Sequence, residues 1–178
     1  MAKTSYPDKS NARGIWKLSD ITKNKLTEGT WIGSAQDRSI QGMGLISPAS
    51  INTMEYVSIS TLGDSVDFGD LSQARHAGGC VGNHTRGIFV AGMVQPSTAG
   101  VNTMDYVTAA SLGNAADFGD LAEVGWLVNG HANNTRGRVA GFRAGSASSG
   151  SINDLTIASL GNAADFSNLS DARFGTGA

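Results

Sequence analysis

A seven-residue phrase occurs three times in this chain and constrains its fold more than any other feature. Residues 112–118 (LGNAADF) return unchanged as residues 160–166, and residues 62–68 (LGDSVDF) keep the outer Leu-Gly and Asp-Phe frame. The copies start 50 and 48 residues apart. A period in this range is typical of repeat architectures, in which one supersecondary unit is used several times. We therefore expect three repeats, covering about residues 29–73, 74–122 and 123–178.

The composition favours an all-β fold for these repeats. Glycine accounts for 24 of the 178 residues, and only 16% of the residues are charged. Many glycines among small polar residues indicate many tight turns. The formal net charge of −2 predicts no nucleic-acid partner, and no apolar stretch is long enough to predict membrane insertion.

The second repeat shows the expected order of strands most clearly. Small residues fill 74–82, an apolar run follows at 86–93, polar and apolar residues alternate over 102–109, and residues 118–121 lead out of the phrase. Four short strands separated by turn residues are the content of one propeller blade. We expect three kelch-like, four-stranded blades of this propeller type per chain.

The phrase itself is expected to be the hairpin turn inside each blade. Glycine with Asn or Asp supplies a tight reversal after the alternating strand. Its leucine and phenylalanine are then expected to point inward on either side of the turn.

The end of the chain predicts a partner. Residues 170–178 repeat the pattern of residues 72–79, as if a fourth repeat began and stopped. Three blades alone would leave two open faces, whereas propellers usually have four to eight blades. We therefore expect a homo-oligomer, most simply two chains with six blades, although a trimer or an arc packed on other proteins also fits.

Residues 1–28 form a separate segment. They carry a net charge of +3, against −5 for the remainder of the chain. We expect a polar arm followed by a short helix, which docks through four apolar side chains because so short a helix is not stable alone. These assembly residues are Ile15, Trp16, Leu18 and Ile21. The segment either caps the repeats or anchors the chain in a larger particle.

The residue pattern of the repeats resembles that of a known class of proteins. The order Ala-Arg-x-x-Gly-Gly (74–79), Arg-Gly-Ile-Phe-x-x-Gly (86–92) and Met-Asp-Tyr-Val (104–107) resembles a short kelch-like repeat, without the paired Trp of eukaryotic kelch domains. Residues 105–108 and 112–121, with Thr-Arg-Gly, look like repeats of virion structural proteins from tailed phages, especially those of marine and cyanobacterial hosts. Residues 11–19 are similar to the opening of many phage tail and fibre proteins.

This resemblance implies a non-enzymatic virion structural protein, of tail or fibre type, that contacts other virion proteins through residues 1–28. The alternative is a receptor- or glycan-binding module of a fibre, which would contact a host surface receptor or glycan during attachment. The chain's start lacks the features of a secretory signal. We therefore expect synthesis in the host cytoplasm and a final location in the virion.

Two residue types recur in the frame of the repeats. Arg86 and Arg136 stand 50 residues apart, with Arg38 in a comparable place. They are expected to bond a neighbouring blade's carbonyls or a repeated carboxylate, and alternatively to form a ring of cations for sugar acids. The recurring aspartates Asp67, Asp117 and Asp165 are expected to stabilise turns.

Three loops stand at equivalent positions of the repeats and differ in sequence, although the residues on either side of them recur. They are therefore candidate recognition loops. Their candidate residues are Ser47, Pro48, Gln95, Pro96, Ser97, Thr98, Ser146, Ser148 and Ser149. Plain solvent exposure is the alternative for all of them.

No constellation in the sequence predicts catalysis, a cofactor or a metal site. The lone thiol, Cys80, is expected to be an inert core residue because its surroundings resemble a buried strand. His76, His84 and His131 occupy different repeat positions, without the spacing of a metal-binding pair.

Overall fold

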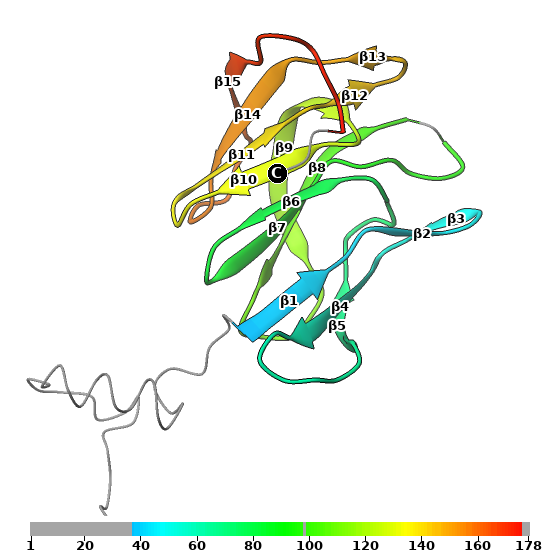
Figure 1. The fold of residues 1–178 in the computed structure, drawn as a ribbon, viewed down its shortest axis with the longest axis vertical. Coiled ribbons are helices and arrows are strands. Elements are labelled where there is room, and N and C mark those ends of the chain that lie inside the picture. Colours follow the sequence, from blue (N-terminus) through cyan, green and yellow to red (C-terminus); the bar gives the residue numbers. More distant parts are fainter. Residues whose placement is uncertain (1–36, 98, 176–178) are drawn as a thin grey trace, which may run out of the picture. The chain divides into compact units, whose positions relative to one another are not determined.

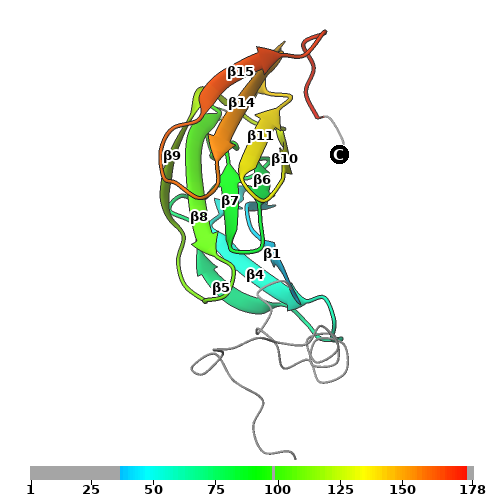
Figure 2. The same cartoon turned by 90° about the vertical axis from the view of Figure 1, so that its left-hand side faces the viewer.

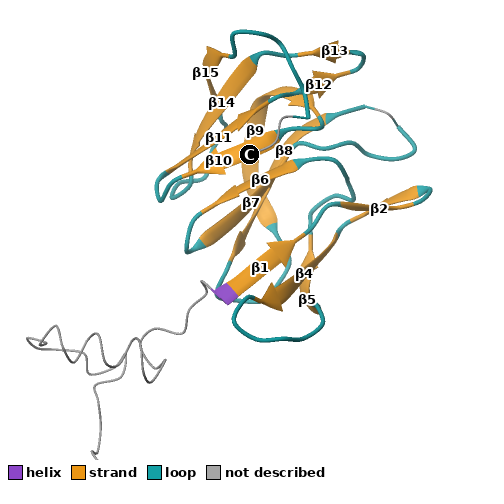
Figure 3. Cartoon of the chain, viewed as in Figure 1, coloured by secondary structure: helices purple, strands orange, loops and turns teal. Residues whose placement is uncertain are grey.

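A computed structural model describes residues 37–97 and 99–175, which fold as an all-β body (Figure 1). The chain divides into two units, residues 1–34 and 35–178, and the account below concerns the second unit. Strands and the loops between them make up nearly all of its described part, without an α-helix (Figure 3). The arm and helix predicted for residues 1–28, with their four docking residues, lie outside the described residues.

The middle repeat is a four-stranded antiparallel meander. Its strands are β6 (Gly79–Gly82), β7 (Arg86–Val90), β8 (Val101–Thr108) and β9 (Ala116–Gly125), hydrogen-bonded in that order. The third repeat has the same order in β10 (Asn129–Ala132), β11 (Arg136–Ala140), β14 (Ser151–Thr156) and β15 (Ala164–Asn168). Each connection, whether a tight turn or a longer loop, brings a strand back antiparallel beside the one before it.

The first repeat contributes a three-stranded sheet and a hairpin within the described residues. The sheet has the order β1 (Arg38–Gln41), β4 (Thr53–Ser58) and β5 (Val66–Asp70). The hairpin pairs β2 (Gly44–Ile46) with β3 (Ala49–Ile51). A second hairpin of this kind, β12 (Arg143–Ala144) with β13 (Ala147–Ser148), stands in the third repeat.

None of the sheets closes on itself, and they follow one another along the body (Figure 2). Strand β10 lies beside β6, and β15 lies beside β9. Each sheet therefore meets mainly the sheet before it and the sheet after it, as in other repeat proteins.

The repeated phrase covers the turn before the last strand of each sheet and the start of that strand, so its turn lies where the sequence predicts. The prediction that its leucine points inward is wrong, because Leu62, Leu112 and Leu160 are all exposed. The phenylalanine differs between copies: Phe68 and Phe118 are each 2% exposed, whereas Phe166 is 53% exposed. In each sheet the pairing of the last two strands shifts register at this phenylalanine, which marks a β-bulge.

The core lies between neighbouring sheets. One cluster joins Met54 and Phe68 of the first repeat to Phe89 and Val107 of the second. A second, larger cluster joins the second and third repeats; its fully buried members include Ile88, Val90, Met104, Val139, Phe142 and Ile157. No repeat therefore buries its apolar face alone, and each depends on its neighbour for stability.

Candidate functional site: the junction between repeats

The phrase loops of the second and third repeats each bind the edge strand of the repeat before. The backbone N–H groups of Gly113 and Ala115 donate to the carbonyls of Phe68 and Asp70, both at 2.8 Å. The side-chain Oδ1 of Asn114 accepts from the backbone N–H of Asp70 at 3.0 Å. We call residues 113–115, and their equivalents 63–65 and 161–163, the clasp.

The same clasp forms at the next junction with the same geometry. Gly161 and Ala163 donate to the carbonyls of Phe118 and Asp120 at 2.8 Å, and Asn162 Oδ1 accepts from Asp120 N–H at 3.0 Å. An edge strand would otherwise expose these backbone groups. The clasp therefore satisfies the outer edge of one sheet with the turn of the following sheet.

A glycine on the edge strand lets the clasp come close. A Cβ at Gly69 would lie 2.4 Å from the carbonyl oxygen of Gly113, and one at Gly119 would lie 2.6 Å from that of Gly161. Both residues have positive φ angles, 139° and 136°. The alanine of each clasp, Ala115 or Ala163, joins the apolar cluster that holds the phenylalanine of the preceding repeat.

The recurring arginines also act across the junctions. Arg38 donates to the carbonyl of Ala109 at 3.1 Å, and Arg86 donates to the carbonyl of Ile157 at 2.9 Å. Both acceptors belong to the following repeat, so these two side chains make the kind of contact expected for the repeat frame. Each guanidinium also lies over the tyrosine of its own repeat; the distances to the ring centroids are 4.7 Å for Tyr56 and 5.0 Å for Tyr106.

A buried ion pair lies at the first junction. Arg75 and Asp105 are both fully buried, and Arg75 Nη1 lies 2.7 Å from Asp105 Oδ2. Arg75 Nη2 donates to the carbonyl of Phe89 at 3.3 Å, while Arg75 Nε has no hydrogen-bond partner. Ser72, on the same segment as Arg75, donates its hydroxyl and its backbone N–H to the Asp105 carboxylate. The carboxylate is thus held by the segment that follows β5, the edge strand of the first sheet.

The second junction uses neutral residues at the same positions. Asn153 stands where the second repeat has Asp105, and its Oδ1 accepts from the backbone N–H of Ala122 at 2.7 Å. Gly125 stands where the first junction has Arg75, 50 residues earlier. The acid and the arginine are therefore replaced together. This paired change is present in the sequence, but without the fold nothing connects the two positions.

The last repeat ends the series differently. Arg136 and Arg138 both contact the carboxylate of Asp154, which replaces the tyrosine of the other repeats, and the Arg138 guanidinium lies 3.8 Å from the ring centroid of Phe166. Arg136, Arg138 and Phe166, with His131, line an open hollow of about 490 Å³. It lies where a following repeat would stand if the series continued.

The repeated aspartates are exposed and make few side-chain contacts. Asp117 Oδ1 accepts from the backbone N–H of Gly119 at 3.3 Å, which is a turn-type contact, and Asp165 accepts from the Ser151 hydroxyl at 3.4 Å. Asp67 is exposed on β5 opposite Glu55. A fourth acid, Asp37, accepts bonds from the hydroxyls of Ser60 and Ser58, and those bonds lower its pKa.

The candidate recognition loops lie between equivalent pairs of strands: β1 and β4, β7 and β8, and β11 and β14. Ser47 and Pro48 form the tip of the β2–β3 hairpin, Gln95, Pro96 and Ser97 lie between β7 and β8, and Ser146 lies at the tip of the β12–β13 hairpin. All three loops project from the same side of the body (Figure 1). Thr98 lies outside the described residues.

Some of these loops are held by side-chain hydrogen bonds to other parts of the repeats. Ser50 Oγ accepts from the backbone N–H of Gln95 at 3.1 Å and lies 2.9 Å from His76 Nδ1. Ser149 donates its hydroxyl to the carboxylate of Glu123. The loops of the first two repeats are therefore linked to each other through Ser50.

The prediction that Cys80 is a core residue is wrong, because its side chain is exposed. It lies on β6 next to Val81, which is buried, and successive residues of a strand point to opposite faces. Desolvation by the atoms around it nevertheless raises the pKa of the thiol. A raised pKa lowers the fraction of nucleophilic thiolate at neutral pH.

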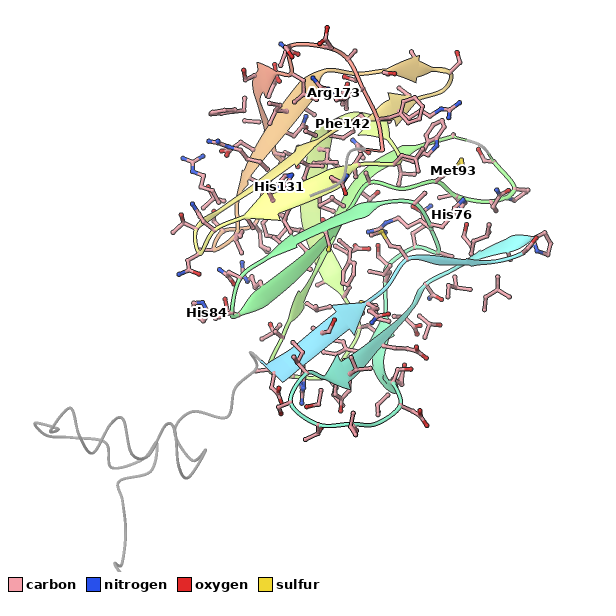
Figure 4. The ribbon with its side chains drawn as sticks, viewed as in Figure 1. His76, His84, Met93, His131, Phe142 and Arg173 are labelled. Atoms are coloured by element: carbon pink, nitrogen blue, oxygen red, sulfur yellow. The ribbon has the colours of Figure 1, made fainter. Side chains whose placement is uncertain are left out.

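The three histidines lie apart, on different parts of the fold (Figure 4). His76 pairs with Met93 through an isolated bridge, His84 lies in the turn between β6 and β7, and His131 lies on β10. Within residues 37–97 and 99–175, no group of three or more His, Cys, Asp or Glu side chains could hold a metal ion. Nor does any helix in these ranges have the length and apolarity to cross a membrane.

No protein-family model matches this sequence, and no curated protein is similar to it.

Proposed function

We propose that this chain is a non-enzymatic structural protein that assembles through its β-repeats. The observation that carries the proposal is that the recurring clasp and two of the recurring arginines bind neighbouring repeats. The clasp, Arg38 and Arg86 form contacts from one repeat to the next, and Ser72 of the first repeat donates to Asp105 of the second. Contacts of this kind between repeats are structural, which is what a scaffold protein requires.

We further propose that the repeats are propeller-type blades. Two of them have four antiparallel strands in sequential order, and the first strands β6 and β10 lie beside each other. These features support a blade arrangement, in which the innermost strands come closest together. Assembly into a homo-oligomer would then extend the series of blades beyond one chain.

The particle that we propose is the virion of a tailed phage, with residues 1–28 as the anchor to other virion proteins. The residue pattern of the repeats supports a virion location, because it resembles that of phage tail and fibre proteins. Under this proposal the protein is made in the host cytoplasm and becomes part of the particle.

Particle incorporation tests this proposal. In the full chain, Ile15, Trp16, Leu18 and Ile21 are replaced together by serine, and the protein content of purified particles is measured by mass spectrometry. We expect the variant to fold, as judged by circular dichroism, but to be absent from particles. A matched variant with serine at Lys17 and Lys23 is expected to be incorporated normally. Incorporation of the four-serine variant at the wild-type level would refute the anchor.

A receptor- or glycan-binding module is the second candidate, favoured by the projection of three variable loops from one side (Figure 1). Loops carried on a rigid frame are common binding sites. Replacing residues 95–100 and 145–150 by Gly-Ser segments of equal length is expected to abolish binding to host cells or to a glycan array. If adsorption is unchanged, these loops are not the recognition surface.

A further inference from the structure

The two ends of the described body carry complementary halves of the junction that joins the first two repeats. We propose that these halves bind each other between two copies of this chain, head to tail. The inference rests on the proposed function only in requiring assembly, and it names the surfaces through which copies meet. The partner is therefore a second copy of the same protein.

The acidic half of this junction lies on the first repeat. Glu55 precedes the glycine of the repeated phrase by eight residues, as Asp105 and Asn153 do in the second and third repeats. Asp105 is buried against Ser72 and Arg75 of the preceding segment. Glu55, in contrast, is exposed, and its described partner is the hydroxyl of Ser65 at 2.9 Å.

The basic half lies at the end of the third repeat. Ser170 and Arg173 follow Leu169 at the same spacing at which Ser72 and Arg75 follow Leu71. The Arg173 side chain is 49% exposed, and the nearby Asp171 carboxylate is 3.9 Å from it and 87% exposed. Arg173 therefore lies at the surface (Figure 4), although it occupies the position of the fully buried Arg75.

The charges match across all three junctions when copies are placed head to tail. An arginine at position 75 meets an acid at position 105, and Gly125 coincides with neutral Asn153. The third junction would bring Arg173 of one copy to Glu55 of the next. An exposed arginine and an exposed glutamate are thus kept at the two positions where an internal junction has its ion pair.

The apolar parts of the two ends also lack the cover that internal junctions have. Phe166 is exposed, whereas Phe68 and Phe118 are buried beneath the clasp of the following repeat. At the other end, Leu62 beside the first clasp, residues 63–65, is fully exposed, whereas Leu112 and Leu160 beside the two docked clasps are 54% and 56% exposed. Docking this clasp on the edge strand β15 would cover apolar surface at both ends.

One residue makes this junction looser than the internal ones. Ser167 stands at the position of Gly69 and Gly119, where any Cβ would lie within 2.4–2.6 Å of the clasp backbone. The clasp of a second copy must therefore sit farther out on β15. The junction between copies then depends more on Arg173 and Glu55, and Ser167→Gly is expected to tighten association.

Charge reversal of the full chain tests the proposal, with mass in solution measured by sedimentation. Wild type is expected to assemble at about 100 µM, well above a micromolar Kd. Glu55→Arg and Arg173→Glu are each expected to weaken association roughly tenfold or more. In a mixture the two variants can alternate, so that every junction again joins one arginine to one glutamate, and assembly should return. Asp117→Arg, the same change of charge on the middle repeat, should assemble like wild type.

Three results would overturn the proposal: a monomeric wild type at this concentration, single variants that assemble like wild type, or a mixture of variants that does not recover. These outcomes are separable from failure of the proposed function. Particle incorporation through residues 1–28 is measured independently, and it can persist when the head-to-tail junction is absent.

Discussion

Replacing Asp105 by Asn is expected to destabilise the fold strongly, although Asn occupies the same position in the next repeat. The change leaves the Arg75 guanidinium fully buried without a counter-charge, and its Nε already lacks a partner. Removing one member of a buried ion pair typically costs ~3–5 kcal/mol. The Asn side chain can still accept one hydrogen bond from Arg75, so we expect a loss at the lower end, about 3 kcal/mol.

The double variant distinguishes a buried pair from two independent residues. Arg75→Met keeps much of the side-chain volume and leaves the Asp105 carboxylate bonded to Ser72, at a cost of about 2–4 kcal/mol. Arg75→Met with Asp105→Asn removes both charges, as Gly125 and Asn153 do at the second junction. We expect this double variant to lose only about 1–2 kcal/mol, because no unpaired charge stays buried.

Urea unfolding followed by tryptophan fluorescence, to which the buried Trp126 contributes, measures these changes. With a urea m-value of about 2 kcal/mol/M, a loss of about 3 kcal/mol lowers the midpoint by about 1.5 M. The double-mutant cycle should give a coupling energy above about 2 kcal/mol. A coupling below about 0.5 kcal/mol would refute the reasoning, since the two charges would then contribute independently.

Three further predictions concern the clasp, an acid and the thiol. Gly119→Ala is expected to cost about 2 kcal/mol more than Gly161→Ala, because both have positive φ but only Gly119 faces the clasp backbone; equal losses in urea midpoint would contradict this. The pKa of Asp37 should lie below 3.8 by carboxyl NMR titration, since bonds from Ser60 and Ser58 favour the charged form. Its stabilising contribution is then present above its unfolded pKa and lost as the pH falls through the lower folded value, and Ser60→Ala should raise that pKa; an unchanged titration midpoint would exclude the bond. Cys80 should react with iodoacetamide at about pH 8 more slowly than the same thiol in urea, because its pKa is raised in the fold; equal rates would show that desolvation is absent.

The local order of the fold could be predicted from the sequence. The alternating strand predicted at 102–109, which is β8 (Val101–Thr108), and the turn position of the phrase follow from alternation and turn residues, which act over a few positions. Phe68 and Phe118 are buried as expected. Strand boundaries are less exact, and the short hairpins β2–β3 and β12–β13 lie in segments whose composition predicts plain loops.

The residues of the junctions could not be assigned in the same way. Arg75 and Asp105 are 30 residues apart, and neither stands out until two sheets are placed side by side. The exposure of Cys80 and the leucines depends on which face of a strand or loop meets a neighbour. A one-residue shift of register reverses that choice.

The sequence by itself determined that the repeated phrase occurs three times and where each copy turns the chain. Only the tertiary structure decided that the repeated phrase holds two repeats together, with Gly113 and Asn114 bonded to the strand before them. The physical reason is the range of the interactions. Turns and alternation are set by neighbours in the chain, whereas the clasp depends on an edge strand some 44 residues away.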